Sequence, residues 1–225
     1  MELLFLGTGA ADWDAPKPDG ERRYCSSALI DGCLLVDPGP DVFSAAQAHS
    51  IELSRIRYVL NTHRHADHFC PATLERLEAI GARLVPLSAA QTVQLDGYTV
   101  EAYKANHGTA AEAVHFLITA KGKRLYYGLD GAWLLYDEMQ AIRRQGVDLL
   151  VLDGTVGDAH PGDYRVFEHN DLRMVRIMHQ SLGDSVTRCV ISHLAKTLHP
   201  TQTEVEHQLA DDGIEVARDG WSIEL

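Results

Sequence analysis

Three histidines and one aspartate lie within residues 63–68, which read His-Arg-His-Ala-Asp-His. The segment follows the apolar run 56–60, so we predict that it lies at the carboxyl end of a strand. In an extended backbone, residues two apart point the same way, so the first two histidines can bind one ion while the following turn directs the aspartate and the third histidine toward another. Imidazole and carboxylate suit zinc, manganese or iron. The spacing indicates half of a two-metal site; the alternative is a solvated polar turn.

Three later polar residues also follow apolar runs. His107, Asp130 and His193 each come at the end of a predicted strand. Strand packing can hold a side chain rigidly at such a position, which makes each residue a candidate metal ligand. Taken alone, a histidine at a strand end is more often simply hydrogen-bonded. Two divalent ions can hold a bridging hydroxide as a nucleophile, and hydrolysis is therefore the default chemistry.

A further histidine suggests what kind of bond is hydrolysed. Phosphodiester hydrolysis differs from lactone, thioester or β-lactam hydrolysis because a poor alkoxide leaving group must be protonated, and histidine is the natural acid near neutral pH. His169 lies just ahead of a predicted helix, where it can face a cleft, and Asp171 is near enough to orient it. We predict His169 as the general acid; the alternative is an exposed histidine beside a helix cap.

The segment 63–68 resembles the metallo-β-lactamase superfamily. That resemblance implies an α/β fold, a four-layer αββα sandwich with a dinuclear site at one edge. It also implies that Asp37 supports a metal-ligating histidine, although a turn cap is an alternative role for this residue. A histidine at position 65, where the di-iron oxygen-reducing branch carries glutamate, argues against that branch. The predicted ligands are His63, His65 and His107 for the first ion, Asp67, His68 and His193 for the second, and Asp130 as the bridge, with Asp67, His169 and Asp171 as the catalytic residues.

A longer series of motifs resembles the cyclic ribose phosphate phosphodiesterase family of the carbon-phosphorus lyase (phosphonate degradation) pathway. The resemblance implies opening of a five-membered cyclic phosphate, with His169 at the position of the family's catalytic histidine. Members often carry a cysteine-rich zinc site near the N-terminus, whereas residues 12–23 of this chain offer no cysteine pair. The motifs are His63 to His68, Asn106-His107, Leu129-Asp130, Val151-Leu152-Asp153, His169-Asn170-Asp171-Leu172, Ile191-Ser192-His193, Gly213-Ile214-Glu215-Val216 and Asp219-Gly220.

We therefore predict a metal-dependent phosphodiesterase that uses a metal-bridging hydroxide and a histidine acid on a small, cyclic ribose phosphate diester. The cofactors would be two divalent ions, manganese or zinc, with iron also accepted. One alternative is a tRNA 3′-processing endonuclease, although no Gly/Pro-rich basic insertion is present. Another is a lactone or thioester hydrolase, for which His169 would be dispensable. A non-catalytic metal-binding or partner-binding module on the same fold is a third.

The composition of the chain limits which binding partners and which cellular compartment we expect. The formal charge of −12 would become only about −8 with two divalent ions, which disfavours nucleic acid and leaves a small phosphate ester as the expected substrate. No apolar run approaches membrane-spanning length, and the N-terminus lacks the pattern of a signal peptide, so we expect a cytoplasmic protein that does not bind membranes. The four cysteines lack the spacing of a disulfide framework. A homodimer is favoured only by the resemblance.

The hydrophobic pattern predicts strands interleaved with helices over one domain, residues 1–225, consistent with two sheets covered by helices. Asp31-Gly32 is a strong hairpin signal, and Thr201 to Glu204 forms a capping box. Strands are predicted at 3–6, 27–30, 33–36, 56–60, 92–95, 98–105, 113–119, 124–128, 147–152 and 189–191, helices at 41–49, 71–81, 135–146, 171–182 and from 201, and a terminal hairpin at 214–217 with 221–223.

Overall fold

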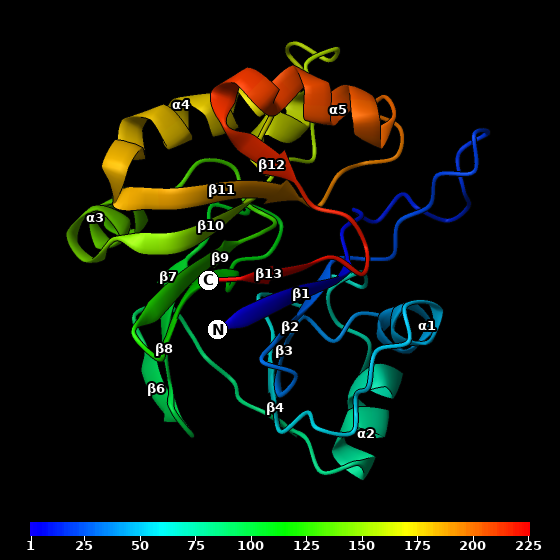
Figure 1. Cartoon of the computed structure of the whole chain (residues 1–225), viewed down its shortest axis with the longest axis vertical. Coiled ribbons are helices and arrows are strands. Elements are labelled where there is room, and N and C mark those ends of the chain that lie inside the picture. Colours follow the sequence, from blue (N-terminus) through cyan, green and yellow to red (C-terminus); the bar gives the residue numbers. More distant parts are fainter. The chain divides into compact units, whose positions relative to one another are not determined.

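The computed structural model describes all residues from 1 to 225. The chain forms two compact units, one made of residues 1–87 and 217–225 and the other of residues 88–216. Each unit contains one mixed β-sheet and its own helices (Figure 1). The prediction of two sheets covered by helices is therefore confirmed, while the single domain over residues 1–225 remains a prediction.

The sheet of the first unit has the strand order β13-β1-β2-β3-β4-β5. Neighbours from β13 to β3 are antiparallel, and β3, β4 and β5 are parallel. The predicted hairpin is confirmed: Asp31 and Gly32 have φ values of 48° and 68°, as a two-residue type I′ turn requires. The elements are β1 (Glu2–Gly7), β2 (Ser27–Ile30), β3 (Leu34–Val36), α1 (Val42–Ala48), β4 (Tyr58–Leu60), α2 (Pro71–Ala79), β5 (Arg83–Leu84) and β13 (Ser222–Glu224).

Helices α1 and α2 pack on one face of this sheet (Figure 1). Leu35 and Val59 of the central strands form a core with Ala45 of α1 and Leu77 of α2, and all four are at least 99% buried. Pro71 occupies the first turn of α2, where its missing N–H has no helical partner to lose. Because β4 and α2 are both fixed by this core, the intervening loop, residues 61–70, is held at both ends.

The sheet of the second unit has the order β12-β11-β10-β9-β8-β7-β6. Strands β12 to β9 are parallel, and β9 to β6 form an antiparallel meander. The carboxyl ends of β9, β10 and β11 therefore meet at one edge. The elements are β6 (Thr92–Leu95), β7 (Tyr98–Lys104), β8 (Val114–Ala120), β9 (Lys123–Gly128), α3 (Tyr136–Gln145), β10 (Val147–Asp153), η1 (Tyr164–Phe167), α4 (Leu172–Leu182), η2 (Gly183–Ser185), β11 (Val186–Ser192), α5 (Gln202–Leu209), η3 (Ala210–Asp212) and β12 (Ile214–Val216).

Helices α3, α4 and α5 supply one side of the second core. Ile142, Val175 and Val205, one from each helix, pack with Leu150 of β10 and Ile191 of β11, and all five are fully buried. The predicted capping box at the start of α5 is confirmed, since the side chain of Thr201 accepts a hydrogen bond from the amide of Glu204. None of the α-helices has both the length and the apolar character needed to cross a membrane.

The predicted terminal hairpin is wrong. Residues 214–216 form β12, which pairs in parallel with β11 in the second unit, whereas residues 222–224 form β13, which pairs antiparallel with β1 in the first. Two short apolar segments separated by Asp219-Gly220 do resemble a hairpin. A local hydrophobic pattern cannot tell whether two such segments pair with each other or with strands that are distant in the sequence.

Candidate metal centre and general acid

In the first unit, residues 61–70 connect β4 to α2 and carry the four donors predicted from the sequence. A turn forms because the amides of His68 and Phe69 both donate to the carbonyl of His65. The backbone of Gly39 packs directly against the carbonyl oxygen of Asp67, and a Cβ at position 39 would overlap it. The loop is therefore shaped by its own turn and by close contact with the segment after β3.

Asp37 is the buried support of this loop. Its Oδ1 accepts hydrogen bonds from the amide (2.7 Å) and hydroxyl (2.9 Å) of Thr62, and its Oδ2 lies 2.9 Å from Nδ1 of His68. Neither Asp37 nor His68 is exposed to solvent. A carboxylate on Nδ1 orients the ring so that Nε2 is the ligand atom, as in carboxylate–histidine–metal triads. The contact matches the supporting role predicted for Asp37.

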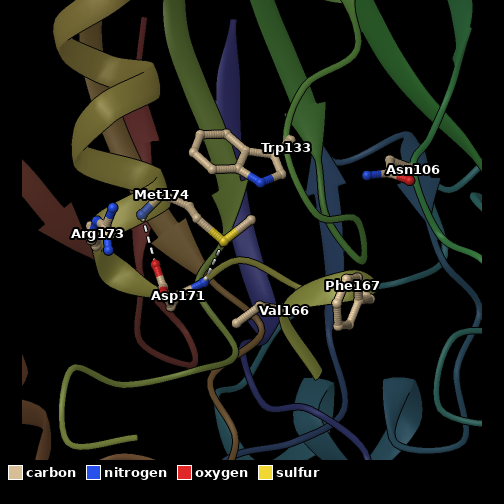
Figure 2. A pocket seen from close by; sticks show the side chains of 7 residues that line it. All are labelled: Asn106, Trp133, Val166, Phe167, Asp171, Arg173 and Met174. Atoms are coloured by element: carbon tan, nitrogen blue, oxygen red, sulfur yellow. Dashed lines mark hydrogen bonds between the residues drawn. The ribbon is translucent and has the colours of Figure 1, made fainter. Parts of the chain in front are cut away.

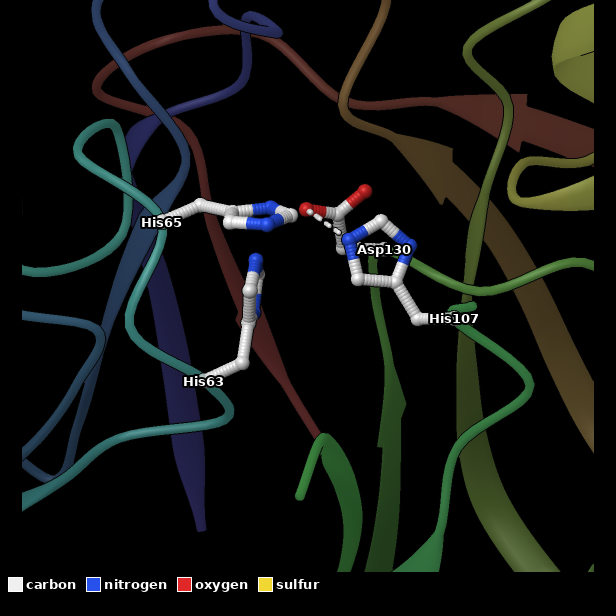
Figure 3. Close-up of side chains that lie close together, drawn as sticks. All are labelled: His63, His65, His107 and Asp130. Carbon is white, nitrogen blue, oxygen red and sulfur yellow. Dashed lines mark ion pairs between the residues drawn. The ribbon is translucent and has the colours of Figure 1, made fainter. Parts of the chain in front are cut away.

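The histidines of the loop lie close together, and Figure 3 shows two of them, His63 and His65. The ring centroids of His63 and His65 are 4.6 Å apart, and those of His63 and His68 are 4.5 Å apart. Oδ2 of Asp67 lies 3.4 Å from Nε2 of His68. Nδ1 of His63 contacts the Thr62 hydroxyl at 3.0 Å, so its Nε2 is the nitrogen suited to binding a metal. These donors, three imidazoles and one carboxylate, are those that zinc and manganese sites use.

In the second unit, His107 and Asp130 come after β7 and β9. Nε2 of His107 lies 3.7 Å from Oδ2 of Asp130, and both side chains are 2% exposed (Figure 3). Nδ1 of His107 contacts the carbonyl oxygen of Glu168 at 3.3 Å, which links the strand end to the segment just before His169.

His169 lies between two buried carboxylates. Its Nδ1 is 2.9 Å from Oδ1 of Asp130 and 2.9 Å from Oδ2 of Asp153. Burial disfavours a charged imidazole, but the two carboxylates outweigh it and raise the pKa of His169 to about 11. The side chain keeps 17% of its surface exposed. Since both contacts use Nδ1, Nε2 is the ring nitrogen suited to transferring a proton to a ligand.

Asp153 organises this part of the second unit. Its Oδ1 accepts from the amides of Thr155 (2.8 Å) and Asn170 (3.1 Å), and the Thr155 hydroxyl contacts Nδ1 of His193 at 2.8 Å. Burial would raise the pKa of Asp153, but His169 and His193 hold it well below its ordinary value. One carboxylate at the end of β10 thus contacts the loop that follows it and the segment around His169, and Thr155 extends this network to His193.

The orienting role predicted for Asp171 is not what the structure shows. Oδ1 of Asp171 accepts a hydrogen bond from the amide of Met174 (2.7 Å), which makes it the N-cap of α4. Asp153 makes the contact with His169 instead. The sequence contained a signal for this, because Asp153 and Asp130 both follow apolar strands and precede glycine. From the sequence, Asp153 stands out only as part of a family motif, and Thr155 carries no signal of its own.

The donors of the second unit converge enough to hold a cation. One ligand atom from each of Asp130, Asp153, His169 and His193 lies within 4.8 Å of the others. Asp130 and His193 have φ values of 62°, and Asp37 in the first unit has 61°, a left-handed conformation that non-glycine residues seldom adopt. Strained backbone at buried polar residues clusters at functional sites. Both the donor chemistry and this strain fit metal binding.

A family model described as "Beta-lactamase superfamily domain" matches residues 33–193, which include every one of these donors. The chain belongs to this superfamily. The predicted superfamily and its α/β fold, two mixed sheets flanked by helices, are confirmed, and so is a metallo-hydrolase at the level of the family.

Curated relatives match this chain only at low sequence identity and over part of its length. A ribonuclease Z of Staphylococcus carnosus (strain TM300) is 28% identical in an alignment of 147 residues that covers 48% of this chain and 46% of that protein. The chain spans about half the length of the curated relatives it matches, 46% and 50%.

Solved structures of the superfamily share the fold over the whole chain. Zn²⁺-bound PqqB from Methylobacterium extorquens has a TM-score of 0.76 at 20% identity, and the match covers 100% of both chains. A diphosphatase from the PhnP family has a TM-score of 0.73 at 21% identity, covering 100% of this chain and 97% of the other. At these identities the likeness concerns the fold.

Proposed function

We propose that this superfamily member is a dinuclear metal-dependent phosphodiesterase that hydrolyses a small phosphate diester, with a cyclic ribose phosphate as the expected substrate. The observation that carries the proposal is the position of His169, which two buried carboxylates hold by Nδ1 while part of its ring reaches solvent. A histidine held in this way can protonate the poor alkoxide leaving group of a phosphodiester as it departs. Likeness to a diphosphatase of the PhnP family gives independent support.

In this proposal the predicted ligands hold two divalent ions, manganese or zinc. When bound, the ions make water nucleophilic at neutral pH and stabilise negative charge on the attacked phosphorus. The expected ligands are His63, His65 and His107 for one ion and Asp67, His68 and His193 for the other, with Asp130 shared between them.

Residues of the chain then transfer a proton to the leaving group. Asp153 and Asp130 keep Nδ1 of His169 engaged and favour the protonated ring. Nε2 donates its proton to the departing alkoxide oxygen as the P–O bond breaks, and Asp153 stabilises the ring in the orientation for this step. Thr155 and the amide of Asn170 fix Asp153 in turn, so the acid is positioned by β10 and not by a mobile loop.

The test compares two substrates that differ only in how much their leaving group needs to be protonated. His169→Ala should reduce kcat/KM for a diester with an alkyl leaving group by about 10²- to 10⁴-fold, and that for a 4-nitrophenyl ester of the same phosphate far less, since nitrophenolate leaves without protonation. His179→Ala, a histidine of α4 outside this network, is the matched control. Equal losses on both esters would remove His169 from the acid role.

A ribonuclease Z activity remains the second candidate, supported by the relative in Staphylococcus carnosus. The same His169 would serve as its acid. Cleavage of a precursor tRNA, assayed beside the small diesters, separates the two, and the charge of −12 favours the small substrate.

A further inference from the structure

A cavity of about 400 Å³ lies in the second unit, next to residues of the proposed site. Asn106, which precedes His107, is on its lining, and so is Phe167, two positions before His169 (Figure 2). The volume falls within the range of roughly 300–1,000 Å³ that small-molecule pockets occupy. A ligand in this cavity would therefore lie beside the segment that carries the proposed general acid.

Trp133 forms part of the lining and is held in place by its backbone. Its amide donates to Oδ1 of Asn170 at 2.8 Å, which ties it to the residue after His169. Its φ is 53°, a left-handed conformation that is unusual for a large side chain, and 41% of its surface is exposed. A strained backbone that presents an indole ring at a cavity wall is a feature expected of a binding site.

Phe167 presents a second aromatic ring. It ends the short helix η1, and 79% of its surface is exposed. Single exposed apolar residues are common, but two large aromatic rings on the lining of one cavity indicate a surface that a ligand covers.

Arg173 adds a positive charge to the same lining. Arg165 and Arg176, the neighbouring arginines along the chain, pair with carboxylates, whereas Arg173 makes no ion pair and is exposed. The carboxylate on the lining, that of Asp171, is engaged at the amide of Met174. In a chain with a formal charge of −12, an unpaired guanidinium on the same lining as two aromatic rings selects for a planar ligand that also carries an anionic group.

We propose that this cavity binds a nucleoside phosphate, with the base against Trp133 and Phe167 and a phosphate oxygen on Arg173. Bases stack on aromatic side chains irrespective of their sequence, and guanidinium pairs with phosphate through two parallel hydrogen bonds. The inference rests on the proposed function and specifies it: the ribose of the substrate carries a base.

Binding of unreactive probes tests the cavity without relying on catalysis. AMP and ribose 5-phosphate share the sugar phosphate and differ in the base, and calorimetry of the metal-loaded protein measures both. We expect AMP to bind the wild type at least about tenfold more tightly, given the usual strength of base–aromatic stacking. Phe167→Ala and Trp133→Ala should each remove most of that preference, and Trp133→Phe should retain part of it.

Matched variants separate the cavity from general effects. Tyr136→Ala removes an aromatic ring that is 76% exposed and lies outside the lining, so it should keep the full preference for AMP. Arg173→Gln should weaken both probes by a similar factor, because both carry the phosphate. Equal affinity of the wild type for AMP and ribose 5-phosphate, or a preference that survives both aromatic-to-alanine changes, would overturn the proposal.

A paired activity assay distinguishes failure of the proposed nucleoside-binding cavity from failure of the proposed phosphodiesterase function. Thymidine 5′-(4-nitrophenyl) phosphate and methyl 4-nitrophenyl phosphate release the same nitrophenolate. The nucleoside ester should show the higher kcat/KM, and Phe167→Ala should lower it for that ester alone. Hydrolysis of both at equal rates refutes the nucleoside subsite and leaves the phosphodiesterase standing. An AMP preference without hydrolysis of either ester refutes the phosphodiesterase and leaves the subsite.

Discussion

The two units supply metal-type donors in different ways. In the first unit all four donors lie on one loop within six residues, and Asp37 supports that loop through Thr62 and His68. In the second unit the donors follow separate strands, with His107 after β7, Asp130 after β9 and His193 after β11, and His169 precedes α4.

This difference determines what a substitution should do. The loop of the first unit takes its shape from local turns, so a change in its support should affect metal binding first. In the second unit Asp153 contacts His169, Thr155 and Asn170, and Thr155 in turn contacts the donor His193. A change there should affect both the chemistry and the stability of the fold, since an interconnected buried polar network loses more than one interaction at once.

The largest effect is expected from Asp153→Asn. An amide has one acceptor oxygen where the carboxylate has two, so its NH₂ group would face either the amides of Thr155 and Asn170 or Nδ1 of His169. We expect a loss of about 3 kcal/mol in the free energy of unfolding, measured by urea denaturation, because a buried charged network is broken.

Asp148→Asn is the matched control, because Asp148 lies on the same strand but pairs with Lys123 in a partly exposed setting. It should cost no more than about 1 kcal/mol. Equal losses for the two variants would mean that Asp153 is not the centre of a buried network.

An intermediate effect is expected from Asp37→Asn. The Asp37 carboxylate, which contacts Nδ1 of His68, would lose its negative charge, and this makes the ring a weaker ligand. The affinity for zinc should therefore fall by about 10- to 100-fold, measured in competition with a chromogenic chelator. Asp31→Asn, in the hairpin turn of the same unit, should leave the affinity unchanged. If Asp37→Asn bound zinc as tightly as the wild type, the carboxylate would serve the turn and not the metal.

The smallest effect is expected from Asp171→Ala. Removing the N-cap of α4 should lower the free energy of unfolding by about 1 kcal/mol, while Asp171→Ser should restore most of it, because serine can accept the same hydrogen bond from the Met174 amide. Thermal denaturation measures both. Equal melting temperatures for the alanine and serine variants would remove the capping role from Asp171.

The same difference explains what could be predicted from the sequence. The loop of the first unit is a local motif, so the pattern of residues 63–68 was enough to predict its donors and the preceding strand. Hairpin turns and helix caps, such as Asp31-Gly32 and Thr201, were equally local and were predicted correctly.

The second unit required knowledge of which strands are neighbours. The partner of His169 was assigned to Asp171 because it is close in sequence, whereas the actual contact comes from Asp153, sixteen positions away on β10. The terminal hairpin failed for the same reason, since β12 and β13 pair with strands far from each other in the sequence. Pairings of this kind depend on the tertiary fold, which hydrophobic periodicity does not encode.

The central claim is that both donor sets bind divalent metal, and elemental analysis of the purified protein after dialysis against zinc or manganese tests it most directly. We expect about two ions per chain in the wild type and about one after either His65→Ala in the first unit or His193→Ala in the second. A wild type that retains no metal, or two variants that each keep the full content, would contradict the account.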